Sequence, residues 1–203
     1  MSQIALPLSH SGSSGPDSIV IGESNRAVAE ALAASQDWPF GTAILAGQPR
    51  SGKSLFARWF ASHTGGGAID DAHKRDETEI FHAWNRAQED GYPLLLTVDA
   101  TGWEIDLPDL RSRMGAALQL EIVPPDDEMA AQLMLSHAAQ RGLALGEGAP
   151  AYLVPRMERS HAAIERIVAE IDRLSLERKV PATMSIWRDA LDAVQGPEQA
   201  RLL

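Results

Sequence analysis

The sequence of 203 residues contains no cysteine, which excludes disulfide bonds and thiolate metal sites. It has no apolar run long enough to cross a bilayer, since the longest one centres on residues 94–96. The first residues lack the basic segment and the long apolar stretch of a secretory signal peptide. These absences predict a soluble, cytoplasmic protein without a membrane partner.

Positive charge is also scarce. Only 18 residues are Lys or Arg, against 28 Asp or Glu, so the formal net charge is −10. A protein that grips a nucleic-acid backbone needs clustered lysines and arginines to release phosphate counterions, and no such cluster occurs. We therefore expect any contact with DNA to be indirect. The hydrophobic fraction of 44% is ordinary and predicts a folded globular protein.

Apolar runs and helical spacing alternate along the first part of the chain. Strand-like runs occur at residues 18–21, 42–46, 68–69, 94–98 and 118–123. Of these, 94–98 and 118–123 are typical of parallel strands covered on both faces. Helical spacing starts at Ser24, at Lys53 and after Asp71, the last helix carrying Ile80, Phe81, Trp84 and Ala87 on one face. From Asp126 onward only helices are predicted, at residues 126–141, 149–159, 161–179 and 184–194.

This order of elements predicts an α/β domain with a short parallel sheet, followed by a small all-helical domain. We expect the boundary near Pro124 and Pro125. The chain then consists of a flexible tail (1–17), a nucleotide-binding domain (18–123) and a helical lid (124–203).

The stretch "AGQPRSGKS" carries the clearest chemical signal, because it fits the phosphate-loop pattern G-x-x-x-x-G-K-[ST]. The glycines let backbone N–H groups surround the β-phosphate, the lysine reaches the β- and γ-oxygens, and the serine can ligate Mg²⁺. The helix that follows adds its dipole. We expect ADP or ATP with Mg²⁺ to contact the whole loop: Gly47, Gln48, Pro49, Arg50, Ser51, Gly52, Lys53, Ser54 and Leu55. The alternative is a glycine turn that binds nothing.

Two carboxylates follow the apolar pair Ala68-Ile69. We expect Asp70 to hold Mg²⁺ through water, together with Ser54, and Asp71 to stand where a general base acts. Acidic residues in this position are also typical of a solvated helix start, which is the alternative interpretation.

Three further stretches resemble the AAA+ ATPases of the DnaA replication-initiator family: "IVIGESN", "LLLTVDA" and "LPDLRSRMGAALQLEIVPPDDE". The resemblance extends over about residues 18–191 and implies a P-loop AAA+ core with a C-terminal helical lid. It places Ile21 and Gly22 beside the adenine, Asp99 at the sensor-1 position and Arg113 in the role of arginine finger. Arg111 is an additional cation nearby, and without the resemblance Arg113 reads as a surface arginine.

The opening hexapeptide "QIALPL" is similar to the Q-x-x-L-P-L peptides that dock on the bacterial DNA-polymerase sliding clamp. Its clamp-binding residues are then Gln3, Leu6, Pro7 and Leu8. A Ser/Gly-rich connection of roughly ten residues reaches about 17–19 Å, which lets the peptide dock while the core turns elsewhere. A short member of the family with such a peptide resembles the regulators that inactivate DnaA.

Two features depart from the family pattern. Few residues separate the helix ending near His63 from Asp70, so we expect the sheet to lack one edge strand. The sensor-2 arginine falls near Ala162, with Arg159 and Arg166 as the nearest replacements.

The leading hypothesis is a regulator that binds adenine nucleotide, docks on the clamp and stimulates hydrolysis of DnaA-bound ATP, with weak or absent hydrolysis of its own. One alternative is a stand-alone P-loop ATPase or small-molecule kinase. Another is a clamp-binding adaptor with a degenerate nucleotide site. The preference for ADP or ATP and the oligomeric state, a homodimer included, stay open.

Overall fold

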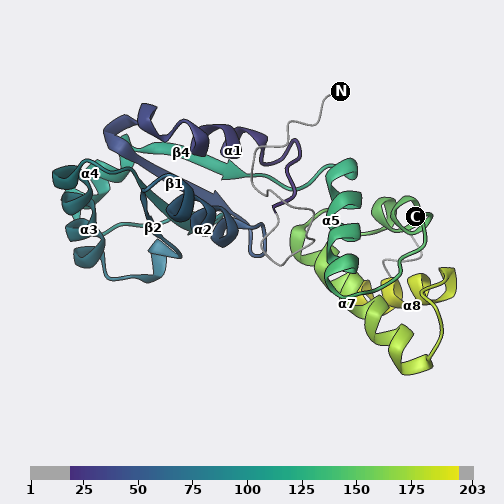
Figure 1. Cartoon of the computed structure of the whole chain (residues 1–203). Coiled ribbons are helices and arrows are strands. Elements are labelled where there is room, and N and C mark those ends of the chain that lie inside the picture. Colours follow the sequence, from purple (N-terminus) through teal and green to yellow (C-terminus); the bar gives the residue numbers. More distant parts are fainter. Residues whose placement is uncertain (1–18, 197–203) are drawn as a thin grey trace. The chain divides into compact units, whose positions relative to one another are not determined.

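The structure is a computed structural model and describes residues 19–196 (Figure 1). These residues form two compact units, which we treat separately. One comprises Ser24–Val123, and the other comprises the described residues before Ser24 and after Val123. Residues 19–23 thus group with the helical unit, whereas the sequence assigned residues 18–123 to a single domain. Within the described part of the chain, no helix is long and apolar enough to cross a membrane.

The first unit is built on a four-stranded parallel sheet with the order β2-β3-β1-β4. Its strands are β1 (Thr42–Gly47), β2 (Gly67–Ile69), β3 (Leu94–Asp99) and β4 (Leu118–Ile122). Its helices are α1 (Arg26–Ala33), α2 (Lys53–His63), α3 (Glu77–Asp90) and α4 (Pro108–Ala116). Short 3-10 turns lie at Ser35–Asp37, Pro39–Gly41 and Ala72–Lys74. The predicted α/β class is confirmed, and α2 leads to β2 through residues 64–66 alone.

One face of the sheet packs against α3 and α4. The buried cluster there joins side chains of β1 and β3 to both helices: Ile44, Leu94, Leu96, Val98, Ile80, Ala87, Leu110 and Met114. Side chains alternate across a strand, so these strand residues share a face. The cluster fixes α3 and α4 against the sheet and thereby sets the position of Arg113, which is on α4.

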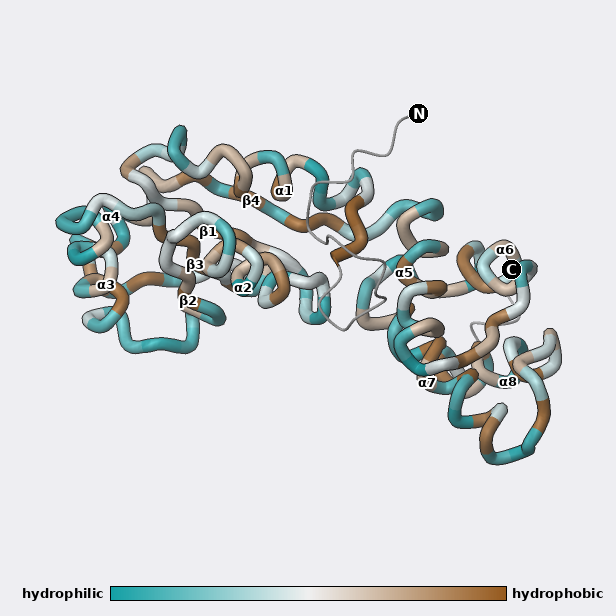
Figure 2. Tube along the Cα trace, in the orientation of Figure 1, coloured by the Kyte–Doolittle hydropathy of each residue, from teal (hydrophilic) through white to brown (hydrophobic). Residues whose placement is uncertain are grey.

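The prediction of two doubly covered strands is right for one and wrong for the other. β3 is buried along residues 94–98, as a central strand should be. β4 is an edge strand in which Gln119 and Glu121 are exposed, and the alternation is visible along β4 in Figure 2. An edge position leaves part of a strand facing water, which favours polar residues at every second place.

The strand expected at residues 18–21 is also wrong over its described part. Residues 19–21 are half-buried but form no strand. β-branched residues favour extended backbone, yet a strand also needs a neighbour in the sheet, and the order β2-β3-β1-β4 includes none from this segment.

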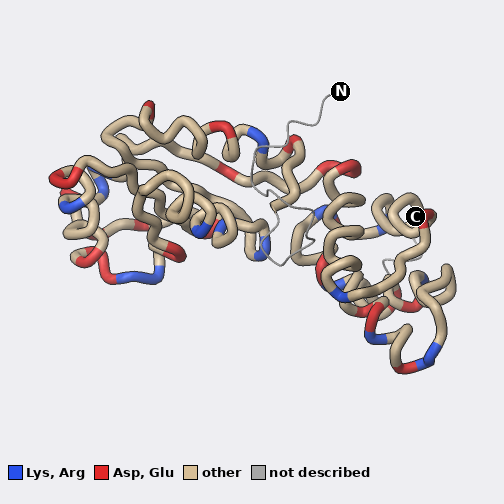
Figure 3. Tube along the Cα trace, in the orientation of Figure 1, with Lys and Arg blue, Asp and Glu red and all other residues tan. Residues whose placement is uncertain are grey.

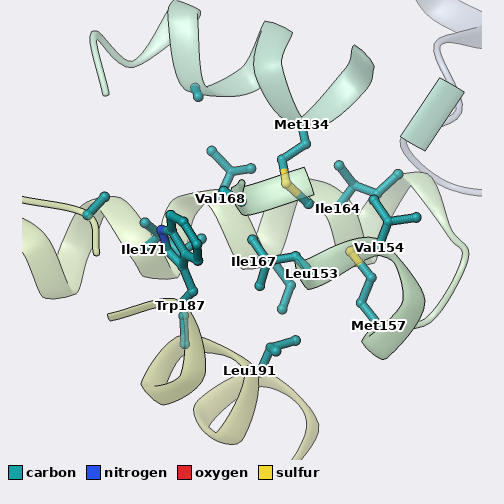
Figure 4. Packing of buried hydrophobic residues seen from close by; sticks show 14 of the residues in the cluster. Met134, Leu153, Val154, Met157, Ile164, Ile167, Val168, Ile171, Trp187 and Leu191 are labelled. Carbon is teal, nitrogen blue, oxygen red and sulfur yellow. The ribbon is translucent and has the colours of Figure 1, made fainter. Parts of the chain in front are cut away.

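The second unit is all helical, with α5 (Asp127–Gln140), α6 (Ala149–Leu153), α7 (His161–Arg178) and α8 (Met184–Gln195). Its core is formed by apolar residues from all four helices, among them Met134, Leu153, Ile164, Ile171 and Leu191 (Figure 4). Asp126 and Ser160 begin α5 and α7 by accepting backbone hydrogen bonds from Met129 and Ala163.

One predicted helix in this unit is interrupted. The helix expected over residues 149–159 ends at Leu153 and continues only as a 3-10 turn, Val154–Arg156. Pro155 lacks the N–H that would donate to the carbonyl of Ala151, and its ring would clash with that carbonyl in a regular helix.

Candidate functional site

The loop between β1 and α2 has the local geometry that its sequence predicts. Gly47 has no room for a side chain, because a Cβ there would lie 2.7 Å from Ser51 Oγ and 3.3 Å from Ile122 Cβ. Gly52 has a φ of 94°, which favours glycine. No side chain caps α2 at Gly52, and the backbone N–H groups at an uncapped helix N-terminus favour an anion, as a phosphate loop requires.

Lys53 lies within this loop. Its side chain Nζ donates to the carbonyl of Gly47 and, at 2.9 Å, to that of Gln48. Burial lowers the pKa of Lys53 from its ordinary value. Three nearby carboxylates act in the opposite direction and raise it, those of Asp99, Asp71 and Asp70. The loop therefore places a lysine ammonium between backbone carbonyls and a group of acidic side chains.

Asp70 and Asp71 follow β2 and are both anchored by one threonine of the neighbouring strand. Thr97 Oγ1 donates to Asp70 Oδ1 at 2.5 Å and accepts from the backbone N–H of Asp71 at 2.9 Å. Thr97 is fully buried in β3. The hydroxyl thus fixes the direction in which the chain leaves β2.

Asp71 has an unusual local environment for an expected general base. Its φ of 53° is in the left-handed region, and its carboxylate accepts a 2.8 Å hydrogen bond from Lys74 Nζ. That hydrogen bond lowers the pKa of Asp71 below its ordinary value. Figure 3 shows acidic and basic residues close together in the segment between β2 and α3. A carboxylate held in an ion pair is a weaker proton acceptor.

Asp99 ends β3 in register with Gly47, the last residue of β1. Its Oδ1 accepts from the backbone N–H of Ala100 at 2.9 Å. Since the carboxyl ends of parallel strands meet at one edge of a sheet, the residues after β1, β2 and β3 gather there. The structure brings together three of the expected acidic residues with Lys53.

The residues expected to hold Mg²⁺ are consistent with that ion. Ser54 stands in the first turn of α2, and Asp70 is oriented by Thr97. Both offer hard oxygen ligands, and Mg²⁺ in nucleotide sites takes few protein ligands and keeps waters and phosphate oxygens. Within residues 19–196, no group of three or more His, Cys, Asp or Glu side chains is arranged to hold a metal ion.

Arg113 lies in the last turn of α4 and contacts α3. Its Cζ is 4.4 Å from the ring centroid of Phe81 and 4.7 Å from that of Trp84. Its Nη1 donates to the backbone carbonyl of Asp109 at 3.1 Å. Arg111, by contrast, is exposed and donates through Nε to the carbonyl of Ile105 at 2.7 Å.

Arg113 and the phosphate loop lie at opposite ends of the strands: Arg113 is near the amino ends, and the loop follows a carboxyl end. α4 ends at Ala116, and β4 begins at Leu118, so this end of α4 is next to the start of a strand. Trp84, which contacts Arg113, donates through Nε1 to Thr42 Oγ1 at 3.0 Å, at the first residue of β1. The phosphate loop follows the last residue of β1, about 17 Å away at roughly 3.3 Å per residue.

The remaining predicted residues have less specific surroundings. Ile21 is half-buried, and Gly22 is close to Met129, whose Cγ and Sδ would lie 2.9 Å from a Cβ at that glycine. Arg50 is exposed with a φ of 68°, Pro49 is exposed, and Leu55 is half-buried. The predicted clamp-binding residues Gln3, Leu6, Pro7 and Leu8 lie outside the described residues.

Position 162, near which the family pattern has the sensor-2 arginine, is an alanine in this chain. Arg159 forms a 2.9 Å ion pair with Asp127, in which both side chains are well exposed. Arg166 lines a pocket of about 520 Å³ in the helical unit, with Arg156 and Glu158 among its neighbours.

Sequence reasoning missed three residues of this region. The apolar run 94–98 predicts only a buried strand for Thr97, although a lone hydroxyl in "LLLTVD" is a signal of a hydrogen-bonding role. Helical spacing predicts only a shared helix face for Phe81 and Trp84, whereas in the structure Arg113 contacts both rings.

Comparison with known proteins agrees with this architecture. The family model of the Hda lid domain matches residues 126–191. The chromosomal replication initiator protein DnaA of Magnetococcus marinus is 26% identical over 63% of this chain, and the match spans only 29% of that relative. Domain III of DnaA from Thermotoga maritima has a TM-score of 0.71 at 13% identity, covering 88% of this chain and 95% of that one. A DnaA bound to AMPPCP and single-stranded DNA has a TM-score of 0.60 at 17% identity, covering 79% of this chain and 66% of that one.

Proposed function

Because the chain belongs to the DnaA/Hda family of AAA+ proteins, we propose that it is a cytoplasmic regulator of replication initiation. In this proposal it binds an adenine nucleotide and docks on the DNA-polymerase sliding clamp through residues 3–8. It then stimulates hydrolysis of the ATP that DnaA holds, which inactivates the initiator. DNA is contacted only through the clamp.

The position of Arg113 is the observation that carries this proposal. The arginine lies near the amino ends of the strands, whereas the phosphate loop lies at their carboxyl ends. It is too far from its own loop to stabilise charge on a phosphate bound there. A cation in this position suits the phosphates of a neighbouring molecule, as an arginine finger supplied by one protein to another does.

Nucleotide binding is supported by the loop geometry and by the solved relative described with AMPPCP. Lys53 and the N–H groups at the start of α2 would hold the phosphates, while Ser54 and Asp70 would hold Mg²⁺. The ion, when bound, supplies charge neutralisation between phosphate oxygens. The residues of this chain supply the binding site and its orientation.

Weak hydrolysis by the chain itself is supported by the surroundings of Asp71. Its Oδ2 accepts a hydrogen bond from Lys74, so this carboxylate oxygen is already engaged and would have to leave its partner to accept a proton from water. The nucleotide in this chain then has a structural role, and the reaction takes place on the partner.

The test measures conversion of DnaA-bound ATP to ADP in the presence of DNA-loaded clamp. Arg113→Ala should lose most of the stimulation and retain nucleotide and clamp binding. Fingers of GTPase-activating proteins contribute about 10³–10⁵ in rate, which is the upper limit for the loss. Arg111→Ala and the double variant show how far the second cation compensates.

Arg156→Ala is a matched control, because Arg156 stacks on Tyr152 at 4.4 Å in the other unit. It should leave the stimulated rate unchanged. The proposal is wrong if wild type does not accelerate hydrolysis, or if the Arg111/Arg113 double variant performs as wild type does. If the wild-type protein binds the clamp but binds neither ADP nor ATP, it is instead a clamp-binding adaptor with a degenerate nucleotide site.

A further inference from the structure

We propose that Phe81 and Trp84 are positioning residues that hold the Arg113 guanidinium in the orientation in which it meets the partner's phosphates. The inference rests on the proposed function, since it concerns the same arginine. It is carried by the two ring contacts, by the anchoring of Trp84 to the sheet and by the joint between α3 and α4.

The rings act on Arg113 without using its hydrogen-bond donors. Phe81 and Trp84 are three positions apart on α3, so they lie on neighbouring turns of one face. Both centroids are within 5 Å of Arg113 Cζ, inside the range of a cation–π contact. Such a contact attracts the charge but takes no N–H group. The guanidinium, whose Nη1 donates to the carbonyl of Asp109, can therefore be held and still donate to a phosphate through its other N–H groups.

The Trp84 ring is itself fixed to the sheet. Its Nε1 donates to Thr42 Oγ1 at 3.0 Å, and that hydroxyl donates to the carbonyl of Phe40 at 2.9 Å. Gln88, one turn further along α3, donates to the same carbonyl at 2.9 Å. These bonds connect α3 to the beginning of β1 and keep the indole from following the arginine.

α3 and α4 are also joined at the start of α4. The carboxylate of Glu77 accepts backbone hydrogen bonds from Asp106 at 2.9 Å and from Leu107 at 2.6 Å. Both donors lie just before Pro108, the first residue of α4, so the carboxylate ties the segment that leads into α4 to the first residue of α3. α3, which bears the two rings, and α4, which bears Arg113, are thus joined at both ends of α4. This limits the space open to the Arg113 side chain.

The alternative arrangement is a free, solvated arginine. Such a side chain samples many rotamers, and ordering it at the moment of reaction has an entropic cost. Stacking on two anchored rings removes much of that freedom before the partner arrives. The expected consequence of losing one ring is a lower maximal stimulated rate, by about three- to tenfold, with little change in clamp affinity.

The first measurement is independent of activity. The side-chain protons of Arg113, assigned by their loss in Arg113→Ala, should resonate upfield in wild type because of ring currents. Phe81→Leu and Trp84→Leu should move them toward the position of a free arginine. Phe81→Tyr and Trp84→Phe retain a ring and should keep the upfield shift, even though Trp84→Phe removes the hydrogen bond to Thr42.

The second measurement repeats the DnaA assay with these variants over a range of concentrations. The leucine variants should lose maximal rate while the half-saturating concentration stays the same, and the aromatic variants should restore the rate. Tyr152→Leu removes an aromatic partner of Arg156 in the other unit and should change neither Arg113 readout. Circular dichroism confirms that each variant is folded.

The outcomes separate the two proposals. If Arg113→Ala loses stimulation but the folded leucine variants match wild type, the positioning role is wrong and the proposed function stands. A faster leucine variant would show that the rings hold the arginine back, which also overturns the inference. If Arg113→Ala keeps full stimulation, both the finger and its positioning are wrong. Unshifted Arg113 protons in wild type refute the stacking itself.

Discussion

Thr97→Val removes a single hydroxyl that connects two strands at the candidate site. The hydroxyl makes a 2.5 Å bond to Asp70 Oδ1 and a 2.9 Å bond from the Asp71 N–H, and the residue is fully buried. Valine has nearly the same shape, so packing is preserved and the change isolates the two hydrogen bonds.

The magnitude follows from what each bond leaves behind. An N–H that loses its buried partner costs about 1–3 kcal/mol, and a hydrogen bond to a carboxylate is worth about 1.5–3 kcal/mol. Both aspartates are half-buried, so water recovers part of these terms. We expect unfolding of the first unit to become easier by about 2 kcal/mol, a fall of about 8–16 °C in the melting temperature of a unit of this size.

Urea unfolding and thermal melts measure the stability, and calorimetry with and without Mg²⁺ measures the second effect. Because Thr97 orients Asp70, the variant should lose more nucleotide affinity in the presence of Mg²⁺ than in its absence. The reasoning is refuted if the free energy of unfolding changes by less than about 0.5 kcal/mol and the Mg²⁺ dependence is that of wild type.

Thr64→Val is a suitable control for this comparison. Like that of Thr97, its hydroxyl makes two hydrogen bonds: it donates to the carbonyl of Phe60 at 2.8 Å and accepts from the backbone N–H of Gly66 at 3.2 Å. Thr64 is only half-buried and lies beyond the far end of α2 from the phosphate loop. The control should lose less stability and show no change in the dependence of nucleotide affinity on Mg²⁺.

Three further changes test other parts of the molecule. Leu6→Ala with Leu8→Ala should weaken clamp binding at least a hundredfold, because each buried leucine contributes about 1.5–3 kcal/mol; normal clamp binding in a pull-down would contradict the docking role. Lys53→Ala should lower ADP and ATP affinity in calorimetry while clamp binding persists, and unchanged affinity would exclude a phosphate contact. The hydrogen bond from Arg173 lowers the pKa of Glu170 below 4.5, so its stabilisation is present above that pH and declines as the pH falls further. Glu170→Gln should remove this decline at a cost of about 0.5 kcal/mol at neutral pH, and an unchanged acid transition would show that the pair does not contribute.

Local patterns in the sequence determined the elements whose formation depends on neighbouring residues. The phosphate loop is an example. Between a strand and a helix, the glycine at position 52 and the lysine after it specify the conformation of the loop without help from distant residues. The four helices of the second unit are another, since apolar residues at helical spacing must share one buried face. Even here one residue changes the outcome. Helical spacing extends to residue 159, but Pro155 lacks the N–H that a regular helix needs, so the α-helix ends at Leu153.

Residues far apart in the chain become neighbours only in the tertiary structure. Thr97 is 27 positions from Asp70, and no spacing rule connects a hydroxyl in one strand to a carboxylate after another. The same holds for the stacking of Phe81 and Trp84 on Arg113, which depends on how α3 and α4 pack on the sheet. Strand order likewise makes β4 an edge strand whose polar residues face water, although its sequence predicts a buried strand. Periodicity reports which residues share a face of their own element, whereas the partner of that face is chosen by the packing of the whole domain.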